Sequence, residues 1–284
     1  MQHGRCITFK EEKIMVVQHN LTAMNSNRQL GITTSAQAKS AEKLSSGYRI
    51  NRAGDDAAGL SISEKMRSQI RGLNKASDNA ADGISLIQTA EGALNETHSI
   101  LQRMNELATQ AANDTNTSID RNAIKAEIDQ LTEEINRIQS TTQFNTMNLL
   151  DGDFSKKSLQ IGALEGHTMS VSISKMSASA IGVSGLSVSS NAAAGTSMTA
   201  IQNAIKSVSD QRSKLGAIQN RLEHTIANLD TTSENTSAAE SRIRDVDMAD
   251  EMVSYSKNNI LAQAGQSMLA QANQSTQGVL SILG

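Results

Sequence analysis

The residue types that usually carry chemistry are scattered along this chain. Its five histidines lie far apart, at His3, His19, His98, His167 and His224, without an HExxH motif, and the chain has a single cysteine. A metal site needs several such ligands at close, regular spacing, so we expect no metal. The chain also has no phosphate-binding loop, no GxGxxG turn and no GxSxG elbow, and we expect no cofactor.

Asp55 and Asp56 are the strongest candidates for a catalytic carboxylate pair. Neighbouring residues on a helix point in different directions, so this spacing alone does not make a general acid and base. Arg49, Arg52 and Gly54 precede the pair, and acidic residues after such a turn are typical of a helix start, where the helix dipole favours them. We therefore expect no catalytic residue and no enzymatic activity.

Arg103 and Leu107 lie four residues apart beside the longest apolar stripe, with Ile100 on the same side, and Glu127 lies off a second stripe. One interpretation is a solvated face with ordinary ion pairs between helical neighbours. The other is a contact surface, because an arginine beside an apolar residue often anchors an interface. The spacing favours the solvated face and leaves the contact surface open.

The composition favours long helices over a wide, compact core. The 284 residues include no proline, no tryptophan and only five aromatic residues, although aromatic side chains usually supply the largest burials in a core. A net charge of −3 argues against a nucleic-acid partner. No run approaches the ~18 apolar residues of a membrane-spanning helix, and no cleaved secretory signal is recognisable.

Three stretches repeat apolar residues at steps of three or four. The longest extends from Ile62 to Ala111 with a mean step of 3.5 residues, and the others cover residues 124–138 and 201–229. That mean step is typical of helices that supercoil around partners. The sequence therefore predicts a mainly α fold, an elongated antiparallel helical bundle or coiled-coil rod. Thr97 and Arg212 are polar exceptions within the stripes.

Two other patterns lie between the second and third stretches. Leu159 and Ile161, and then Met169, Val171 and Ile173, alternate with polar residues, which predicts a β-hairpin over about residues 158–174. Residues 177–199 are mostly Ser, Ala and Gly, without a clear period. We expect this segment to be a flexible surface connection.

Weaker stripes occupy both ends of the chain. Near the start they comprise Val17, Leu21, Met24, Leu30, Thr34, Ala38, Ala41 and Leu44, and near the end Val246, Val253, Ile260 and Met268. Such stripes bury little apolar area, which is small beside the entropy of ordering the backbone. We expect the two terminal helices to pair, to be disordered in a lone chain, and to order against further copies.

Residues 1–14 differ in character from the rest of the chain. They contain the single cysteine, Cys6, and no helical period. The codons for Lys10, Glu11 and Glu12 can spell a purine-rich bacterial ribosome-binding site shortly upstream of Met15. We expect translation to begin at Met15; the alternative is a genuine disordered extension.

Long stretches of the chain resemble bacterial flagellin. They are LSSGYRINRAGDDAAGLSISEKMRSQIRGL at 44–73, DGISLIQTAEGALNETHSILQRMNELATQAAN at 82–113, TQFNTMNLLDG at 142–152, KLGAIQNRLEHTIANL at 214–229 and ESRIRDVDMADEM at 240–252. Together the resemblance covers about residues 15–175 and 198–284, in the order of the family. It implies a structural subunit that assembles with itself into the extracellular flagellar filament.

The resemblance also implies a division of the chain. Residues 15–56 and 241–284 correspond to the inner tube of the filament, and 57–176 and 200–240 to the surrounding rod. The short segment 177–199 replaces the outer domains that many flagellins carry. Export is implied in unfolded form through the flagellar type III apparatus, with partners that include an export chaperone at the C-terminal helix and the filament's cap and junction proteins.

Two sets of site residues follow from the resemblance. Polymerisation is assigned to Val17, Leu21, Met24, Leu44, Val246, Val253, Ile260 and Met268. Recognition by a host's Toll-like receptor 5 is assigned to Arg103, Leu107 and Glu127. A hook–filament junction protein, and a secreted receptor ligand that stays monomeric, are the alternative functions.

Overall fold

The chain divides into two compact units. The computed structural model describes residues 20–283. One unit, called the terminal unit below, comprises Met1–Glu64 with Glu240–Gly284, and the other, the central unit, comprises Lys65–Ala239. The predicted extension 1–14, the start at Met15 and the candidate Val17 lie outside the described residues.

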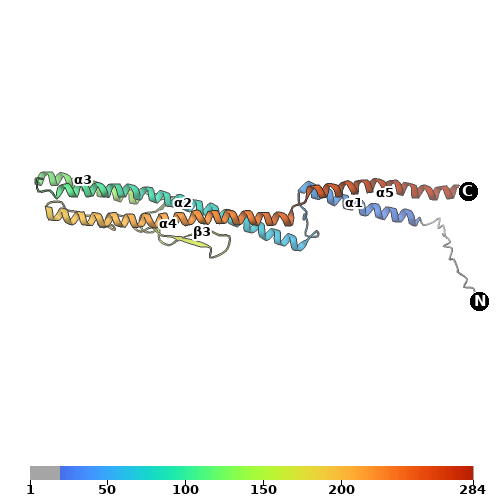
Figure 1. Ribbon diagram of the computed structural model, residues 1–284, viewed down its shortest axis with the longest axis horizontal. Helices are drawn as coiled ribbons and strands as arrows, with labels where there is room; N and C mark the ends of the chain where they lie inside the picture. The colour runs from blue at the N-terminus through green and yellow to red at the C-terminus, as the bar shows by residue number, and fades with distance from the viewer. Residues whose placement is uncertain (1–19, 284) are drawn as a thin grey trace, which may run out of the picture. The chain divides into compact units, whose positions relative to one another are not determined.

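Helices account for most of the described chain (Figure 1). They are α1 (Leu21–Ser46), α2 (Ala57–Ala111), α3 (Ser118–Thr141), α4 (Asn191–Arg244) and α5 (Met248–Leu283). Two antiparallel strand pairs complete it, β1 (Gln143–Phe144) with β2 (Met147–Asn148) and β3 (Lys157–Gln160) with β4 (Thr168–Val171). The predicted mainly α fold with a hairpin is confirmed. None of the described helices combines the length and apolarity that crossing a membrane requires.

The core of the central unit lies between α2, α3 and α4, which run side by side (Figure 1). Leu94 and Leu101 on α2, Ile135 on α3 and Ile201 and Leu215 on α4 are fully buried in one apolar cluster. Their spacing matches the predicted stripes. Because a single helix cannot bury such a stripe, mutual packing is what holds these helices in place.

The polar exceptions in the stripes are accommodated by hydrogen bonds. Thr97 is buried, and its hydroxyl donates to the Ala93 carbonyl at 3.0 Å. On α4 the amide of the buried Gln211 donates to the Ser172 carbonyl at 3.3 Å, and its neighbour Arg212 contacts Glu91 at 3.4 Å. A buried polar group is tolerated when it is paired in this way.

The β3–β4 hairpin pairs Leu159 with Met169 and buries Met169 and Val171. Its loop rests directly on α2 at Gly72. A Cβ atom added at Gly72 would lie 2.8 Å from the Cβ and 3.3 Å from the Cα of Ala163. The absence of a side chain at Gly72 therefore lets the hairpin loop approach the helix.

We expect Gly72→Ala to destabilise the central unit by about 1 kcal/mol, because the added methyl displaces the loop backbone at Ala163 by overpacking. Gly92→Ala is the matched control, since apart from the adjacent residues and backbone of its own helix no heavy atom lies within 4 Å of the corresponding position at Gly92. Alanine should stabilise that helical site by about 0.5–1 kcal/mol. Urea unfolding of both variants checks this, and equal shifts would contradict the contact at Ala163.

Residues 177–190 differ from the expected flexible surface connection. Ile181, Val183, Leu186 and Val188 are buried in the same cluster as the helical core. Positive φ angles at Gly182 and Gly185 let the chain turn tightly between them. These isolated apolar residues show no period because turns, and not a helix or strand, direct them inward. The remaining residues, from Asn191, begin α4.

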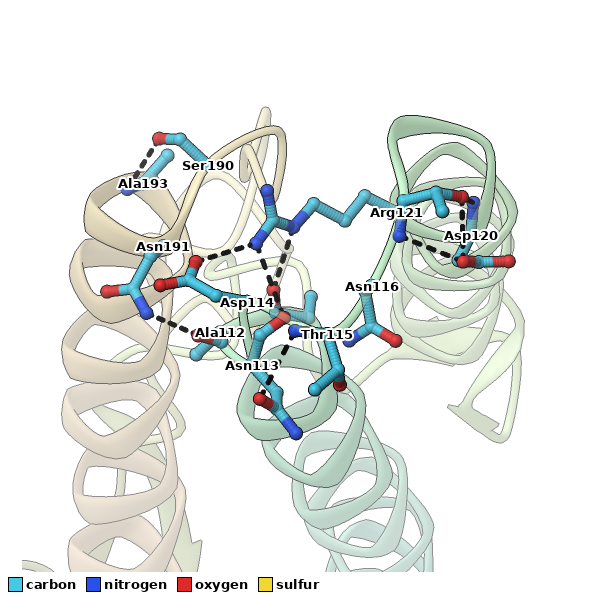
Figure 2. A network of polar contacts seen from close by, with 12 residues as sticks. Ala112, Asn113, Asp114, Thr115, Asn116, Asp120, Arg121, Ser190, Asn191 and Ala193 are labelled. Carbon is cyan, nitrogen blue, oxygen red and sulfur yellow. Dashed lines mark hydrogen bonds and ion pairs between the residues drawn. The ribbon is translucent and has the colours of Figure 1, made fainter.

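Polar contacts join the ends of α2, α3 and α4 (Figure 2). The Arg121 guanidinium donates to the carbonyls of Ala111 and Asn113, at 3.1 and 3.3 Å, and to the Asp114 carboxylate at 3.2 Å. The Asn191 side chain donates to the carbonyl of Ala112. These contacts satisfy carbonyls that the end of α2 leaves without helical partners.

A capping box starts α3. The Thr117 hydroxyl and backbone N–H both donate to the Asp120 carboxylate, at 2.7 and 2.9 Å, and the Asp120 N–H donates back to Thr117 Oγ1 at 3.4 Å. The hydrogen bond from the Thr117 side chain and that from its backbone lower the pKa of Asp120. The charged form of Asp120 is therefore favoured in the folded state.

We expect Asp120→Asn to lower the free energy of unfolding at pH 7. A lowered folded-state pKa contributes stability above the ordinary carboxyl pKa, and that stability is lost as the pH falls through the folded value. The difference between wild type and Asp120→Asn should therefore shrink as the pH is lowered toward 3. Urea unfolding over that pH range measures it; a constant difference would show that the charge of Asp120 is not involved.

The terminal unit contains the predicted pairing of the two ends of the chain. Helices α1 and α5 lie side by side and antiparallel (Figure 1). Their least exposed residues alternate at steps of three and four, and we call them the terminal seam. On α1 these are Ala23, Ser26, Leu30, Thr33, Gln37, Ser40 and Leu44; on α5 they are Glu251, Tyr255, Asn258, Ala262, Gly265, Leu269 and Ala272.

The terminal seam corrects the stripe expected on α1. Thr34, Ala38 and Ala41 are exposed, and the contacting positions are Thr33 and Ser40 instead. Small residues allow the helices to approach closely: a Cβ added at Gly265 would lie 3.2 Å from Leu30 Cδ1. The side of α1 that faces α5 therefore combines Leu30 and Leu44 with small or polar residues.

Backbone pairing fixes the point where α1 ends and α5 begins. Gly47 ends α1 with a φ of 75°, and its carbonyl accepts from the Val246 N–H at 3.0 Å. The Arg49 N–H donates to the Arg244 carbonyl at 2.7 Å, and the Arg244 guanidinium lies 4.7 Å from the centre of the Tyr48 ring. Residues almost two hundred positions apart are thus held together in this unit.

Candidate assembly surface

Large apolar side chains are exposed on the outer sides of α1 and α5. We call this set the assembly surface. It consists of Leu21, Met24 and Ile32 on α1 and Met248, Met252, Val253, Ile260, Leu261 and Met268 on α5. In the described central unit, the large apolar residues exposed to this degree are Ile119, Met147 and Leu164. The terminal unit therefore carries most of the exposed apolar side chains.

The terminal helices reverse the usual amphipathic arrangement. Their contacting sides carry mostly Ala, Gly, Ser, Thr, Gln and Asn, while Val253 and Ile260 on the outside are 69% and 65% exposed. Large apolar side chains exposed in this number on one helix pair are typical of a contact with another molecule. The residues that would stabilise a helix pair by burial are available for contact with another molecule.

Few charges interrupt this surface away from Met248 and Met252, which lie among Asp247, Asp250 and Glu251. Between residues 20 and 38 the one charged residue is Arg28, and between 253 and 275 it is Lys257. The charged pairs of the terminal unit gather at the other end of α1, where Lys43 lies 3.6 Å from Glu251 and Arg52 lies 3.0 Å from Glu42. A partner that covers the apolar part of the surface would desolvate little charge, which lowers the cost of binding.

The structure places most of the predicted polymerisation residues on the assembly surface. Leu21, Met24, Val253, Ile260 and Met268 are all more than 60% exposed. Two others lie inside the unit instead. Leu44 is part of the terminal seam, and Val246 is half-buried beside Gly47. These two residues support the helix pair and are not exposed contacts.

Four residues of the assembly surface are not among those predicted from the sequence: Ile32, Met248, Met252 and Leu261. Ile32 lies eight residues after Met24, and Leu261 is the neighbour of Ile260. A search of the sequence for a single apolar stripe misses these four residues, because it assumes that the most apolar face of a helix is the buried face. On α1 and α5 the most apolar face is exposed, so the apolar residues adjacent to it belong to the assembly surface as well.

The candidate receptor residues occupy the central unit. Arg103 lies 3.0 Å from Glu127 on α3 and 3.1 Å from Glu106, and all three side chains are exposed. Hydrogen bonds to Glu127 and then to Glu106 raise the pKa of Arg103. Leu107 is 2% exposed and belongs to the apolar core. This corrects the expectation that an apolar side chain stands beside Arg103 on the surface.

The carboxylates Asp55 and Asp56 form turn and cap contacts. Asp55 accepts from the N–H groups of Arg52 and Asn51 at 3.0 and 3.3 Å, and these hydrogen bonds lower its pKa. Asp56 accepts from the Gly59 N–H at 2.8 Å at the start of α2. In the part of the chain that the structure describes, no three His, Cys, Asp or Glu side chains gather as metal ligands would.

Comparison with known proteins identifies relatives over most of the chain. The bacterial flagellin N-terminal helical region matches residues 17–155, and the C-terminal helical region matches residues 198–283. The flagellin of Halalkalibacterium halodurans is 57% identical over 271 residues, covering 95% of this chain and all of the relative. That of Bacillus subtilis is 52% identical with the same coverages. The crystal structure of Bacillus cereus flagellin is 32% identical, covers 57% of this chain and 94% of that chain, and has a TM-score of 0.49.

Proposed function

Because this chain belongs to the bacterial flagellin family, a family of structural proteins of the extracellular flagellar filament and not of enzymes, we propose that the assembly surface joins neighbouring copies. The observation that carries the proposal is the reversed arrangement of α1 and α5, with Leu21, Val253 and Ile260 exposed and small residues in the terminal seam. A second copy that presents the same surface would remove these side chains from water at about 25 cal/mol per Å².

The assignment of chain segments to the parts of the filament follows from the same proposal. Residues 15–56 and 241–284 form the inner tube of the filament, and residues 57–176 and 200–240 form the rod around it. The terminal seam supports this assignment, because a helix pair with so few large apolar contacts gains its stability from further copies. In dilute solution α1 and α5 should exchange their amide hydrogens quickly, and in the filament slowly.

Seeded growth tests the proposal. Purified protein is added to filament fragments, and elongation is followed by electron microscopy. We expect long filaments from the full chain and none after deletion of residues 245–284, with the central unit still helical by circular dichroism. Growth by the truncated chain would overturn the role of the assembly surface. A hook–filament junction protein would add only a short ring to the seeds.

Export and assembly partners belong to the same proposal. The chain is exported unfolded through the flagellar type III apparatus, its C-terminal helix is held by an export chaperone before export, and cap and junction proteins contact the filament. Two features support this. The exposed apolar residues of α5 need a cover before assembly, and a chain without proline has no slow cis/trans step after passage.

Arg103 supports a second proposal, recognition of the free subunit by Toll-like receptor 5. Its guanidinium is exposed and is oriented by Glu127 and Glu106 on two helices. An arginine held in this way loses less freedom on binding than a mobile one. Leu107 contributes only as packing beneath the helix surface. A receptor ligand that stays monomeric would retain this surface but fail the seeded-growth test.

We expect Arg103→Ala to weaken receptor signalling by free subunits and to leave filament growth normal. Arg137→Ala is the matched control, because Arg137 is also exposed and paired with a glutamate, Glu134, on the same helix. A reporter assay at limiting dose compares the two variants with wild type. Equal signalling by Arg103→Ala and wild type would remove Arg103 from the receptor contact.

A further inference from the structure

Methionine is unusually frequent on the assembly surface. Met24, Met248, Met252 and Met268 are 62%, 49%, 52% and 62% exposed. The methionines of the central core, Met104, Met169 and Met176, are buried. Four of the nine residues on the assembly surface therefore carry a thioether that solvent and small oxidants can reach in the free subunit.

The antiparallel pairing of α1 and α5 places these methionines at both ends of the helix pair. The Asn20 side chain donates to the Ala272 carbonyl at one end, Leu30 meets Gly265 in between, and Lys43 lies beside Glu251 at the other end. Met24 and Met268 are thus level with one another near the first contact. Met248 and Met252 lie near the last one. A change at the methionines would affect the contact surface along its length.

We propose that these four methionines are an oxidation site through which peroxide controls assembly; the proposal rests on the proposed function of the assembly surface. The sulfur lone pair attacks one peroxide oxygen, the O–O bond breaks and an S–O bond forms. Hydrogen peroxide is reduced to water, and the sulfur loses two electrons to give the sulfoxide. No other co-reactant is required.

The sulfoxide opposes assembly because it is strongly polar. Where a neighbouring copy covers it with an apolar side chain, water is removed from an oxygen that gains no donor in return, and an unpaired buried polar group costs enough to weaken binding about tenfold or more. The same covering shields the thioethers in the filament. Free subunits are therefore the sensitive form, and assembled ones the protected form.

The test compares peroxide-treated and untreated subunits in seeded growth, with sulfoxide at each methionine measured by peptide mass spectrometry. We expect treatment to raise the critical concentration for growth about tenfold or more, and methionine sulfoxide reductases to restore it. The variant Met24→Leu/Met248→Leu/Met252→Leu/Met268→Leu should grow equally well before and after treatment. Met147→Leu is the matched control, because Met147 is 42% exposed in the central unit; it should leave the sensitivity unchanged.

Each outcome decides a different point. If untreated wild type does not elongate seeds, the proposed function fails. If it elongates and the fourfold variant remains as sensitive to peroxide as wild type, the oxidation site is overturned and the proposed function stands. If the fourfold variant itself does not assemble, the peroxide-treated wild type decides the question. Recovery of its filament growth after treatment with the reductases supports the oxidation site. A loss of growth that persists after the sulfoxides are removed overturns it.

Discussion

The double substitution Val253→Asp/Ile260→Asp is expected to abolish the growth of filaments from seeds. Both side chains are more than 60% exposed on α5. They lie seven residues apart and therefore on the same face of the helix. Aspartate at these positions stays solvated in the free subunit, but a neighbouring copy would have to desolvate two carboxylates without partners. An uncompensated buried charge costs about 3–5 kcal/mol, so elongation should fall by more than about a hundredfold.

A conservative pair provides the control for this experiment. Val253→Ile/Ile260→Leu keeps both positions apolar and should support growth at nearly the rate of wild type. Urea unfolding of the central unit should be the same in all three proteins, because neither position belongs to its core. Normal growth of the aspartate variant would mean that the assembly surface lies elsewhere on the subunit.

Leu101→Ala is expected to have the largest effect on the stability of the central unit. Leu101 is fully buried in the apolar cluster that α2, α3 and α4 share. Truncation of a buried leucine removes its transfer free energy and leaves a cavity, which together cost about 2–5 kcal/mol. The midpoint of urea unfolding should fall accordingly.

Leu164→Ala is the matched control, because Leu164 is 57% exposed in the hairpin loop. Removal of the same atoms there should change the free energy of unfolding by no more than about 0.5 kcal/mol. Circular dichroism followed through the urea transition measures both variants. Equal losses in the two would contradict the assignment of the core to the faces of α2, α3 and α4.

The central helices show where reasoning from sequence succeeds. Residues such as Leu94, Leu101, Ile135 and Leu215 recur at helical spacing, and all are buried where that spacing predicts. The pattern is reliable because each of these helices buries a strong apolar stripe against others. The β3–β4 hairpin was predictable for a similar reason, since alternation of polar and apolar residues distinguishes the two faces of a strand.

Residues 177–190 show where the same reasoning fails. Val183, Leu186 and Val188 carry no period, yet they are buried. Turns at Gly182 and Gly185 direct them into the core, and a non-repeating fold of this kind leaves no periodic trace. Leu107 is a related case. It lies beside the main stripe of α2, and its burial depends on which other segments pack there.

Identification of the assembly surface required both the sequence and the tertiary structure. The sequence identifies apolar residues such as Val253 and Ile260, but spacing cannot tell a buried stripe from an exposed one. The helix pair decides the question, because its packing places Gly265 and Ala262 opposite α1 and leaves Val253 and Ile260 outside.

By itself, the sequence determines the helical class of the chain, the registers of the three central stripes, the hairpin and the family, because each of these is carried by local spacing or by long specific motifs. The tertiary structure decided which residues are available for contact: Leu107 and Val183 inside, Arg103 and Ile260 outside. Exposure is a property of what packs against a residue, and the packing partners here come from segments far apart in the chain.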